Sequence, residues 1–199
     1  NCGLPYYISR EIKSRSHLIL QTPESFYSRY KIQVRLHTEA IQINRYEKYV
    51  LAKTETGEEK VFYDKLILSQ GANPILPDVP GVSKENAFTL RDIDDMDKIH
   101  NFIDEKSPKT AVVVGGGFIG LEMAEALVER GLNVTLVEKY KHLMPIADPE
   151  FGELIRRTFE EKNVRVVAAD SAVGYEANDK QLVLESGAKI SADMILFSI

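Results

Sequence analysis

Hydrophobic and polar positions change their spacing several times along the chain, and each change marks a predicted element. Apolar residues alternate with polar ones over residues 32–36, 41–43 and 50–52, which predicts strands. Thr56-Gly57 supplies a turn between two of them. The short apolar run Leu66–Leu68 predicts a buried strand at the end of this meander. The first part of the chain is therefore predicted to be rich in antiparallel β-structure.

Helical spacing takes over in the second half, where the predicted order is β-α-β-α-β. Apolar residues three or four apart follow an acidic first turn over residues 92–106, which predicts an amphipathic helix. The other predicted elements are a helix capped by Thr22, strands at 111–114, 133–138, 164–168 and 194–197, helices at 118–130 and from Asp148, and a hairpin near 178–179. This order predicts an α/β fold with a parallel, Rossmann-like sheet.

Proline and glycine mark the predicted domain boundary. Residues 70–81 hold three prolines and two glycines, too many for a helix or a central strand. We expect residues 1–81 to be part of one domain with a β-meander, 82–106 to be a linker and helix, and 107–199 to be the dinucleotide-binding domain. Both ends are expected to be truncated, because no initiator Met begins the chain and the last strand stops without a turn.

Composition excludes several classes of protein. Lysine and arginine number 25 against 30 acidic residues, so a net charge of −5 offers no basic field for nucleic acid. No apolar run reaches the roughly 18 residues that cross a bilayer, and no secretory signal pattern is present, so a cytoplasmic protein is expected. A single Cys excludes a disulfide framework, and the four His are scattered, so no metal site is expected.

The run Gly115-Gly116-Gly117-Phe118-Ile119-Gly120 fits the G-x-G-x-x-G dinucleotide fingerprint, between a predicted strand and a predicted helix. Gly115 permits the tight turn, Gly117 lets a pyrophosphate approach the backbone, and Gly120 lets the helix pack on the sheet. Glu138 ends the next strand, where a carboxylate accepts from ribose hydroxyls. Its charge favours NADH, whereas Lys139 and Lys141 could meet the extra phosphate of NADPH, so both cofactors remain candidates.

The lone thiol, Cys2, has no second cysteine nearby with which to form a dithiol motif. A redox role would therefore pass through a mixed disulfide with a small thiol or through a sulfenic acid. A partly buried structural cysteine is the equally open alternative on local evidence.

Three segments carry a resemblance to a known family. Asn1-Cys2-Gly3-Leu4-Pro5-Tyr6-Tyr7 resembles the single-cysteine segment of the coenzyme A-disulfide reductase group of flavin-dependent pyridine nucleotide–disulfide oxidoreductases. Residues 63–72 are similar to the segment where the chain of that family returns to the flavin, and Gly115–Glu122 resembles its nicotinamide-domain fingerprint. The single-cysteine branch also includes NADH oxidases, NADH peroxidases and persulfide reductases.

The resemblance implies that residues 1–81 are part of a flavin-binding domain and residues 107–199 the NAD(P)H-binding domain. It also implies FAD and either NADH or NADPH as cofactors, a small-molecule disulfide of the coenzyme A type as substrate, and a homodimer in the full-length protein. Cys2 would be the catalytic nucleophile beside the flavin. The implied cofactor-binding positions are Asn1, Ala40, Ser69, Gln70, Gly71, Arg91, Phe118, Ile119 and Glu122. Gln70 departs from the Pro or Thr that is more usual there, whereas Phe118 matches an aromatic residue that gates the nicotinamide pocket.

The leading hypothesis is an NAD(P)H-dependent flavoprotein that reduces low-molecular-weight disulfides or persulfides, most simply coenzyme A disulfide. One alternative is an NADH oxidase or peroxidase in which Cys2 forms a sulfenate. The other is a non-catalytic nucleotide-binding redox sensor, which would leave the segment around Cys2 unexplained. An internal piece without the family's first glycine-rich flavin loop and its dimerisation domain is expected to turn over little by itself.

Overall fold

The computed structural model describes residues 2–199, which pack into two compact units. One unit contains residues 2–18 together with 73–199, and the other contains residues 19–72. Residues 2–18 thus pack with the predicted dinucleotide-binding part of the chain. The three-part domain division given above remains a prediction for the intact protein.

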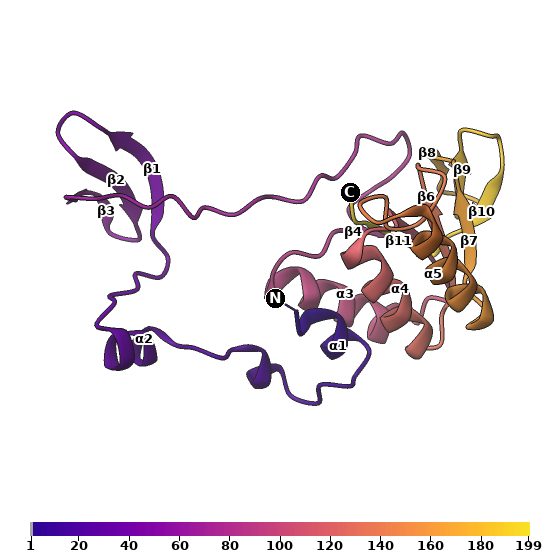
Figure 1. The fold of residues 1–199 in the computed structure, drawn as a ribbon, viewed down its shortest axis with the longest axis horizontal. Coiled ribbons are helices and arrows are strands. Elements are labelled where there is room, and N and C mark those ends of the chain that lie inside the picture. The colour runs from indigo at the N-terminus through magenta and orange to yellow at the C-terminus, as the bar shows by residue number, and fades with distance from the viewer. Residues whose placement is uncertain (1) are drawn as a thin grey trace. The chain divides into compact units, whose positions relative to one another are not determined.

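A five-stranded parallel sheet forms the centre of the first unit (Figure 1). Its strand order is β4-β11-β5-β6-β7, with β4 at Ala87–Phe88, β11 at Met194–Phe197, β5 at Thr110–Val114, β6 at Asn133–Glu138 and β7 at Arg165–Ala168. All neighbouring pairs are parallel. The helices α4 (Phe118–Glu129) and α5 (Pro149–Glu161) connect β5 to β6 and β6 to β7. The predicted α/β fold with a Rossmann-like parallel sheet is confirmed.

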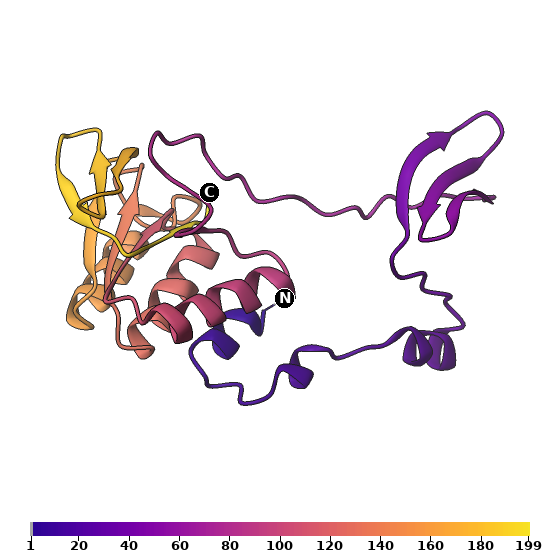
Figure 2. The same ribbon diagram turned by 180° about the vertical axis from the view of Figure 1, so that it is seen from behind.

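Side chains of the sheet alternate between two separate hydrophobic layers, as the pleat requires. Ala111 and Val113 face a core shared with α1 (Leu4–Ile8), α3 (Ile93–Lys106), α4 and α5. Val112 and Val114 face a second core beneath the antiparallel sheet β10-β9-β8. Its strands are β8 (Ala172–Glu176), β9 (Gln181–Leu184) and β10 (Lys189–Ser191). Helices therefore cover one face of the parallel sheet and a small sheet covers the other (Figures 1 and 2).

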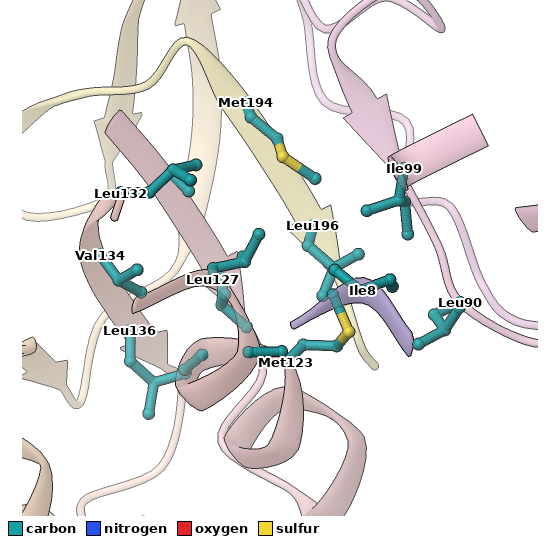
Figure 3. Packing of buried hydrophobic residues seen from close by; sticks show 14 of the residues in the cluster. Ile8, Leu90, Ile99, Met123, Leu127, Leu132, Val134, Leu136, Met194 and Leu196 are labelled. Atoms are coloured by element: carbon teal, nitrogen blue, oxygen red, sulfur yellow. The ribbon is translucent and has the colours of Figure 1, made fainter. Parts of the chain in front are cut away.

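The short helix α1 belongs to the larger of these cores. Leu4 is 3% exposed and Ile8 is fully buried. Figure 3 shows Ile8 among Ile99 of α3, Met123 of α4 and Leu196 of β11. The sequence pattern did not predict α1 or the 3-10 helix η1 (Arg15–Leu18) that follows it.

The ends of three helices show which side chains and glycines cap them; Gly131 was expected from the sequence, whereas the cap at Asp92 was not. Asp92 precedes α3, and its Oδ1 accepts from the backbone N–H of Asp95 at 3.0 Å. Gly131 follows the last turn of α4 with φ +80°, a conformation that favours glycine. Asp148 and Pro149 begin α5 as expected, although the Asp148 side chain makes no capping bond.

The second unit is a small β-meander preceded by a helix. Thr22 and Ser25 form the reciprocal capping bonds that begin α2 (Pro23–Tyr30). Strands β1 (Glu39–Asn44), β2 (Tyr49–Thr54) and β3 (Gly57–Phe62) pair in antiparallel order, which confirms the predicted meander. A register shift interrupts the β1–β2 pairing between Ala40 and Gln42.

Two predicted strands of this unit are wrong. Residues 32–36 are irregular, and His37 adopts φ +50°, which ends any extended run. Residues 66–68 are also irregular, with Ile67 87% exposed. Alternating or apolar residues form a strand only where another strand accepts their backbone hydrogen bonds, and neither segment has such a neighbour in the described chain.

Asp193 joins the start of β5 to the turn before β11. Its Oδ2 accepts from the backbone N–H groups of Lys109 (3.0 Å) and Thr110 (3.1 Å), and its Oδ1 accepts from Lys180 Nζ at 2.9 Å. Burial alone raises the pKa of Asp193, but these hydrogen bonds outweigh it and lower the pKa to about 2. The carboxylate form is therefore the one that the fold stabilises.

We expect Asp193→Asn to lower the free energy of unfolding at pH 7 by about 2 kcal/mol, because a depressed carboxyl pKa stabilises the folded state above the unfolded pKa. This contribution is lost as the pH falls from about 4 towards 2. Urea unfolding of both proteins at pH 7 and pH 3 measures it. A stability difference that is equal at the two pH values would contradict the assignment.

Candidate functional site

The glycine loop between β5 and α4 is shaped by backbone conformation and by close neighbours. Gly115 has φ +111°, and a Cβ there would lie 2.5 Å from the carbonyl oxygen of Ser198. A Cβ at Gly120 would overlap the carbonyl of Gly115. At Gly117, by contrast, a Cβ would meet nothing within 4 Å. The first and third glycines are thus required by packing, whereas the second leaves open space at the start of α4.

The N-terminus of α4 lies at this open space, and its first amides are not used by the helix itself. The first bond of the helix runs from Leu121 N to Gly117 O at 3.0 Å. The amides that precede Leu121 in the first turn have no partner within the helix, and the helix dipole adds positive charge there. Such a terminus binds phosphate groups.

A cavity of about 510 Å³ adjoins the loop at the carboxyl ends of the strands. Gly115, Gly117 and Glu138 line it, together with Lys139, Tyr140, Pro145, Asp170 and Phe197. It joins helix amides, a carboxylate and apolar walls, the combination that a dinucleotide requires. The residues present therefore fit a bound nicotinamide dinucleotide.

Glu138 lies at the end of β6 and is only 5% exposed. Its Oε2 accepts from the backbone N–H of Gly116 at 2.6 Å, and its Oε1 accepts from that of Tyr140 at 2.8 Å. The predicted ribose ligand is thus in the cavity wall and is also bonded to the glycine loop.

Sequence reasoning missed two polar residues of this site. Ser198 follows β11, and its hydroxyl donates to the carbonyl of Gly115 at 2.9 Å. Asp170 follows β7 and accepts from the hydroxyl of Ser186 at 2.6 Å. This bond is the largest of several hydrogen-bond effects that lower the pKa of Asp170. Both residues follow the carboxyl end of a parallel strand, which is the signal that could have found them.

Cys2 is an exposed, free thiol immediately before α1. Leu4 and Ile8 anchor that helix in the core against α3 and α4. A small cavity of about 130 Å³ between α1 and α4 is lined by Tyr6 and Glu122 among others. The structure therefore brings the thiol segment and the helix of the dinucleotide fingerprint into one packed unit.

Polar contacts also hold α1 to this unit. Arg130, whose side chain is 7% exposed, donates to the carbonyl of Ile8 at 2.8 Å and pairs with Asp104. Arg10 bonds the same carboxylate at 2.8 Å. Burial raises the pKa of Asp104, but the arginines and His100 outweigh this effect and lower the pKa overall.

We expect Arg130→Met to lower the free energy of unfolding by about 1–3 kcal/mol, because the Asp104 carboxylate and the Ile8 carbonyl each lose a nearly buried donor. Chemical denaturation measures the change, with Arg157→Met on the exposed face of α5 as control. Equal stability of the two variants would show that Arg130 is not part of the attachment of α1.

The remaining predicted positions divide between the two units. Phe118 and Ile119 lie at the start of α4, 66% and 47% exposed. Arg91 belongs to the same unit, where its side chain contacts Asn73. Ala40 lies in β1 at the register shift, and Ser69, Gln70 and Gly71 form an exposed, irregular segment. These four residues belong to the second unit, and Asn1 lies outside the described residues.

A parallel sheet that presents helix amides and a buried carboxylate to one cavity defines a dinucleotide-binding α/β protein. Comparison with known families makes the class specific. The pyridine nucleotide-disulphide oxidoreductase family matches residues 2–199, and the chain belongs to this family.

Individual relatives agree with this membership. The coenzyme A disulfide reductase of Staphylococcus haemolyticus is 33% identical over 198 residues, which is 98% of this chain and 44% of that protein. An NADH oxidase of Methanocaldococcus jannaschii is 30% identical over 99% of this chain and 45% of its own length. The crystal structure of reduced Bacillus anthracis CoADR-RHD superposes with a TM-score of 0.93 and 42% identity, covering all of this chain and 36% of that one.

The chain spans less than half the length of these relatives. Among the described residues, no helix has the length and apolar character needed to cross a bilayer. The same part of the chain holds no cluster of three or more His, Cys, Asp or Glu side chains suited to a metal ion.

Proposed function

We propose that the intact protein is an FAD-dependent, NAD(P)H-using reductase of low-molecular-weight disulfides or persulfides, with coenzyme A disulfide as its preferred substrate class. The observation that carries the proposal is the packing of α1, with Cys2 just before it, on the helix of the dinucleotide fingerprint. A thiol that only filled the core would be buried, and Cys2 is exposed. Its segment belongs to the same compact unit as the dinucleotide cavity, which suits transfer of electrons from the dinucleotide to sulfur.

The chain's own residues then have separate tasks. The amides at the start of α4 hold the pyrophosphate of the dinucleotide, and Glu138 accepts from its adenosine ribose. Cys2 Sγ attacks one sulfur of the disulfide, forms a mixed disulfide and releases the first thiolate. Bound FAD supplies the two-electron relay from the nicotinamide to this sulfur centre. Two electrons and a proton then release the second thiol and regenerate the Cys2 thiolate.

Support for coenzyme A disulfide comes from relatives whose names state that activity, at 33% identity and lower. The homodimer, the flavin contacts of Ala40, Ser69, Gln70, Gly71 and Arg91, and the cytoplasmic location remain predictions. The buried carboxylate of Glu138 favours NADH, whereas Lys139 in the same cavity wall suits NADPH.

Two measurements on the intact protein test the proposal. The purified protein should show a flavin absorbance spectrum that bleaches anaerobically on addition of NADH or NADPH. Coenzyme A disulfide should then reoxidise the flavin faster than oxygen or hydrogen peroxide does. A protein without flavin would be a nucleotide-binding sensor. Preferential turnover with peroxide would make it a peroxidase, and preferential turnover with oxygen an oxidase, as the name of its Methanocaldococcus relative states for that protein.

A further inference from the structure

The peptide units of Gly116 are held from both sides by a single segment, residues 138–144. The Gly116 N–H donates to Glu138 Oε2 at 2.6 Å, and the Gly116 carbonyl accepts from the backbone N–H of Met144 at 2.8 Å. Met144 makes this bond with φ +51°, a conformation that costs a non-glycine residue energy. The middle of the glycine loop is therefore fixed by contacts that are distant from it in sequence.

Close packing adds to these bonds. A Cβ at Gly116 would lie 2.6 Å from Leu143 Cδ2 and 3.1 Å from Glu138 Oε2. Leu143 is fully buried, so this wall of the loop is part of the hydrophobic core. Packing against Leu143 thus prevents the loop from moving towards this wall, and movement away from it would break the bond to Glu138.

The carboxylate of Glu138 bonds two donors, the amides of Gly116 and Tyr140. An ionised carboxylate only accepts, and its two oxygens offer about four acceptor positions. Glu138 can therefore keep both backbone bonds while it accepts from ribose hydroxyls. A glutamine could not, because its NH₂ group would face one of the two amide donors.

We propose that Glu138 is a positioning residue for the glycine loop as well as a ribose acceptor, so that its loss weakens NADH and NADPH alike. The inference rests on the proposed dinucleotide function. A role in charge selection alone makes a different prediction. Removal of the negative charge of Glu138 would then weaken the binding of NADH, but it would strengthen the binding of NADPH by relieving repulsion of the 2′-phosphate. Under the positioning role, the amides of residues 117–119 lose their fixed direction, and the pyrophosphate common to both cofactors binds less well.

The test measures NADH and NADPH binding by calorimetry to the intact wild-type protein and to Glu138→Gln, with Glu161→Gln, an exposed residue at the end of α5, as matched control. We expect Glu138→Gln to weaken both cofactors by about tenfold or more, and Glu161→Gln to change neither by more than about twofold. Unchanged or tighter NADPH binding by Glu138→Gln would overturn the inference.

Amide hydrogen exchange without nucleotide gives a second readout. In the Gln variant, amide exchange at Gly116 and Met144 should be at least about tenfold faster than in the wild type, because the bonds that hold Gly116 to Glu138 and Met144 are weakened before any ligand binds. Unchanged exchange would overturn the positioning role. If the Gln variant does not fold, Glu138→Ala makes the same test, since it removes the acceptor without adding a donor. Failure of the wild type to bind either nucleotide would instead overturn the proposed function and the inference with it.

Discussion

Replacing Cys2 by serine in the intact protein is expected to lower kcat/KM for coenzyme A disulfide by roughly three orders of magnitude or more. The reaction requires a sulfur that forms and then releases a mixed disulfide, and a hydroxyl does neither. Cys2 is the only cysteine of this sequence and lies exposed before α1. Reduction of the bound flavin by NADH should persist, because the dinucleotide cavity is lined by other residues.

Separate measurement of the two half-reactions checks this expectation. Stopped-flow bleaching of the flavin by NADH should be within about threefold of wild type in Cys2→Ser, while reoxidation by the disulfide should be lost. Ser16→Ala, an exposed hydroxyl in the same segment, is the matched control and should leave both steps intact. Retained disulfide reduction by Cys2→Ser would exclude Cys2 as the reaction centre.

Gly115→Ala is expected to destabilise the fold by about 3 kcal/mol or more. Residue 115 has a φ of +111°, which strains the backbone of an alanine. The added methyl group would also lie 2.5 Å from the Ser198 carbonyl oxygen, which is a steric clash. The clash is with backbone, and rotation of a side chain cannot relieve it. The thermal midpoint and urea unfolding measure the loss.

Gly117→Ala is the variant to compare with Gly115→Ala. Its added methyl group would meet no atom within 4 Å, and the φ of −83° at this position suits alanine. Its stability should lie within about 0.5 kcal/mol of wild type. Dinucleotide affinity should nevertheless fall at least about tenfold, because the methyl occupies the space through which a pyrophosphate approaches the backbone. Unchanged affinity in Gly117→Ala would place the phosphates elsewhere.

Local sequence signals were sufficient for the β5-α4-β6 unit. Strand β5 is an apolar run and β6 is mostly apolar, Gly131 follows the end of α4, and the glycine motif lies between the strand and the helix that it requires. The predicted cap Thr22 was equally local, since it satisfies the amide three residues ahead, that of Ser25.

Elements that depend on distant partners could not be read in this way. Helix α1 has five residues, so its apolar spacing, Leu4 and Ile8, repeats only once. Residues 66–68 have the composition of a strand but no neighbour to pair with in the described chain. The contacts of Gly116 with Glu138 and Met144 join segments more than twenty residues apart, and no local pattern encodes them.

The polar contacts that attach α1 to the rest of its unit, from Arg130 to the Ile8 carbonyl and from Arg10 to Asp104, affect the order in which the chain folds. The hydrogen bond of Arg130 joins residues separated by 122 positions, and the ion pair of Arg10 with Asp104 spans 94. During synthesis from the N-terminus, α1 is made before α3 and α4. It can pack into the core only after those helices have been synthesised. Closing so long a loop is slow and entropically costly. Helix α1, which follows Cys2, is therefore synthesised before the residues that it packs against, and its docking completes this core late in folding.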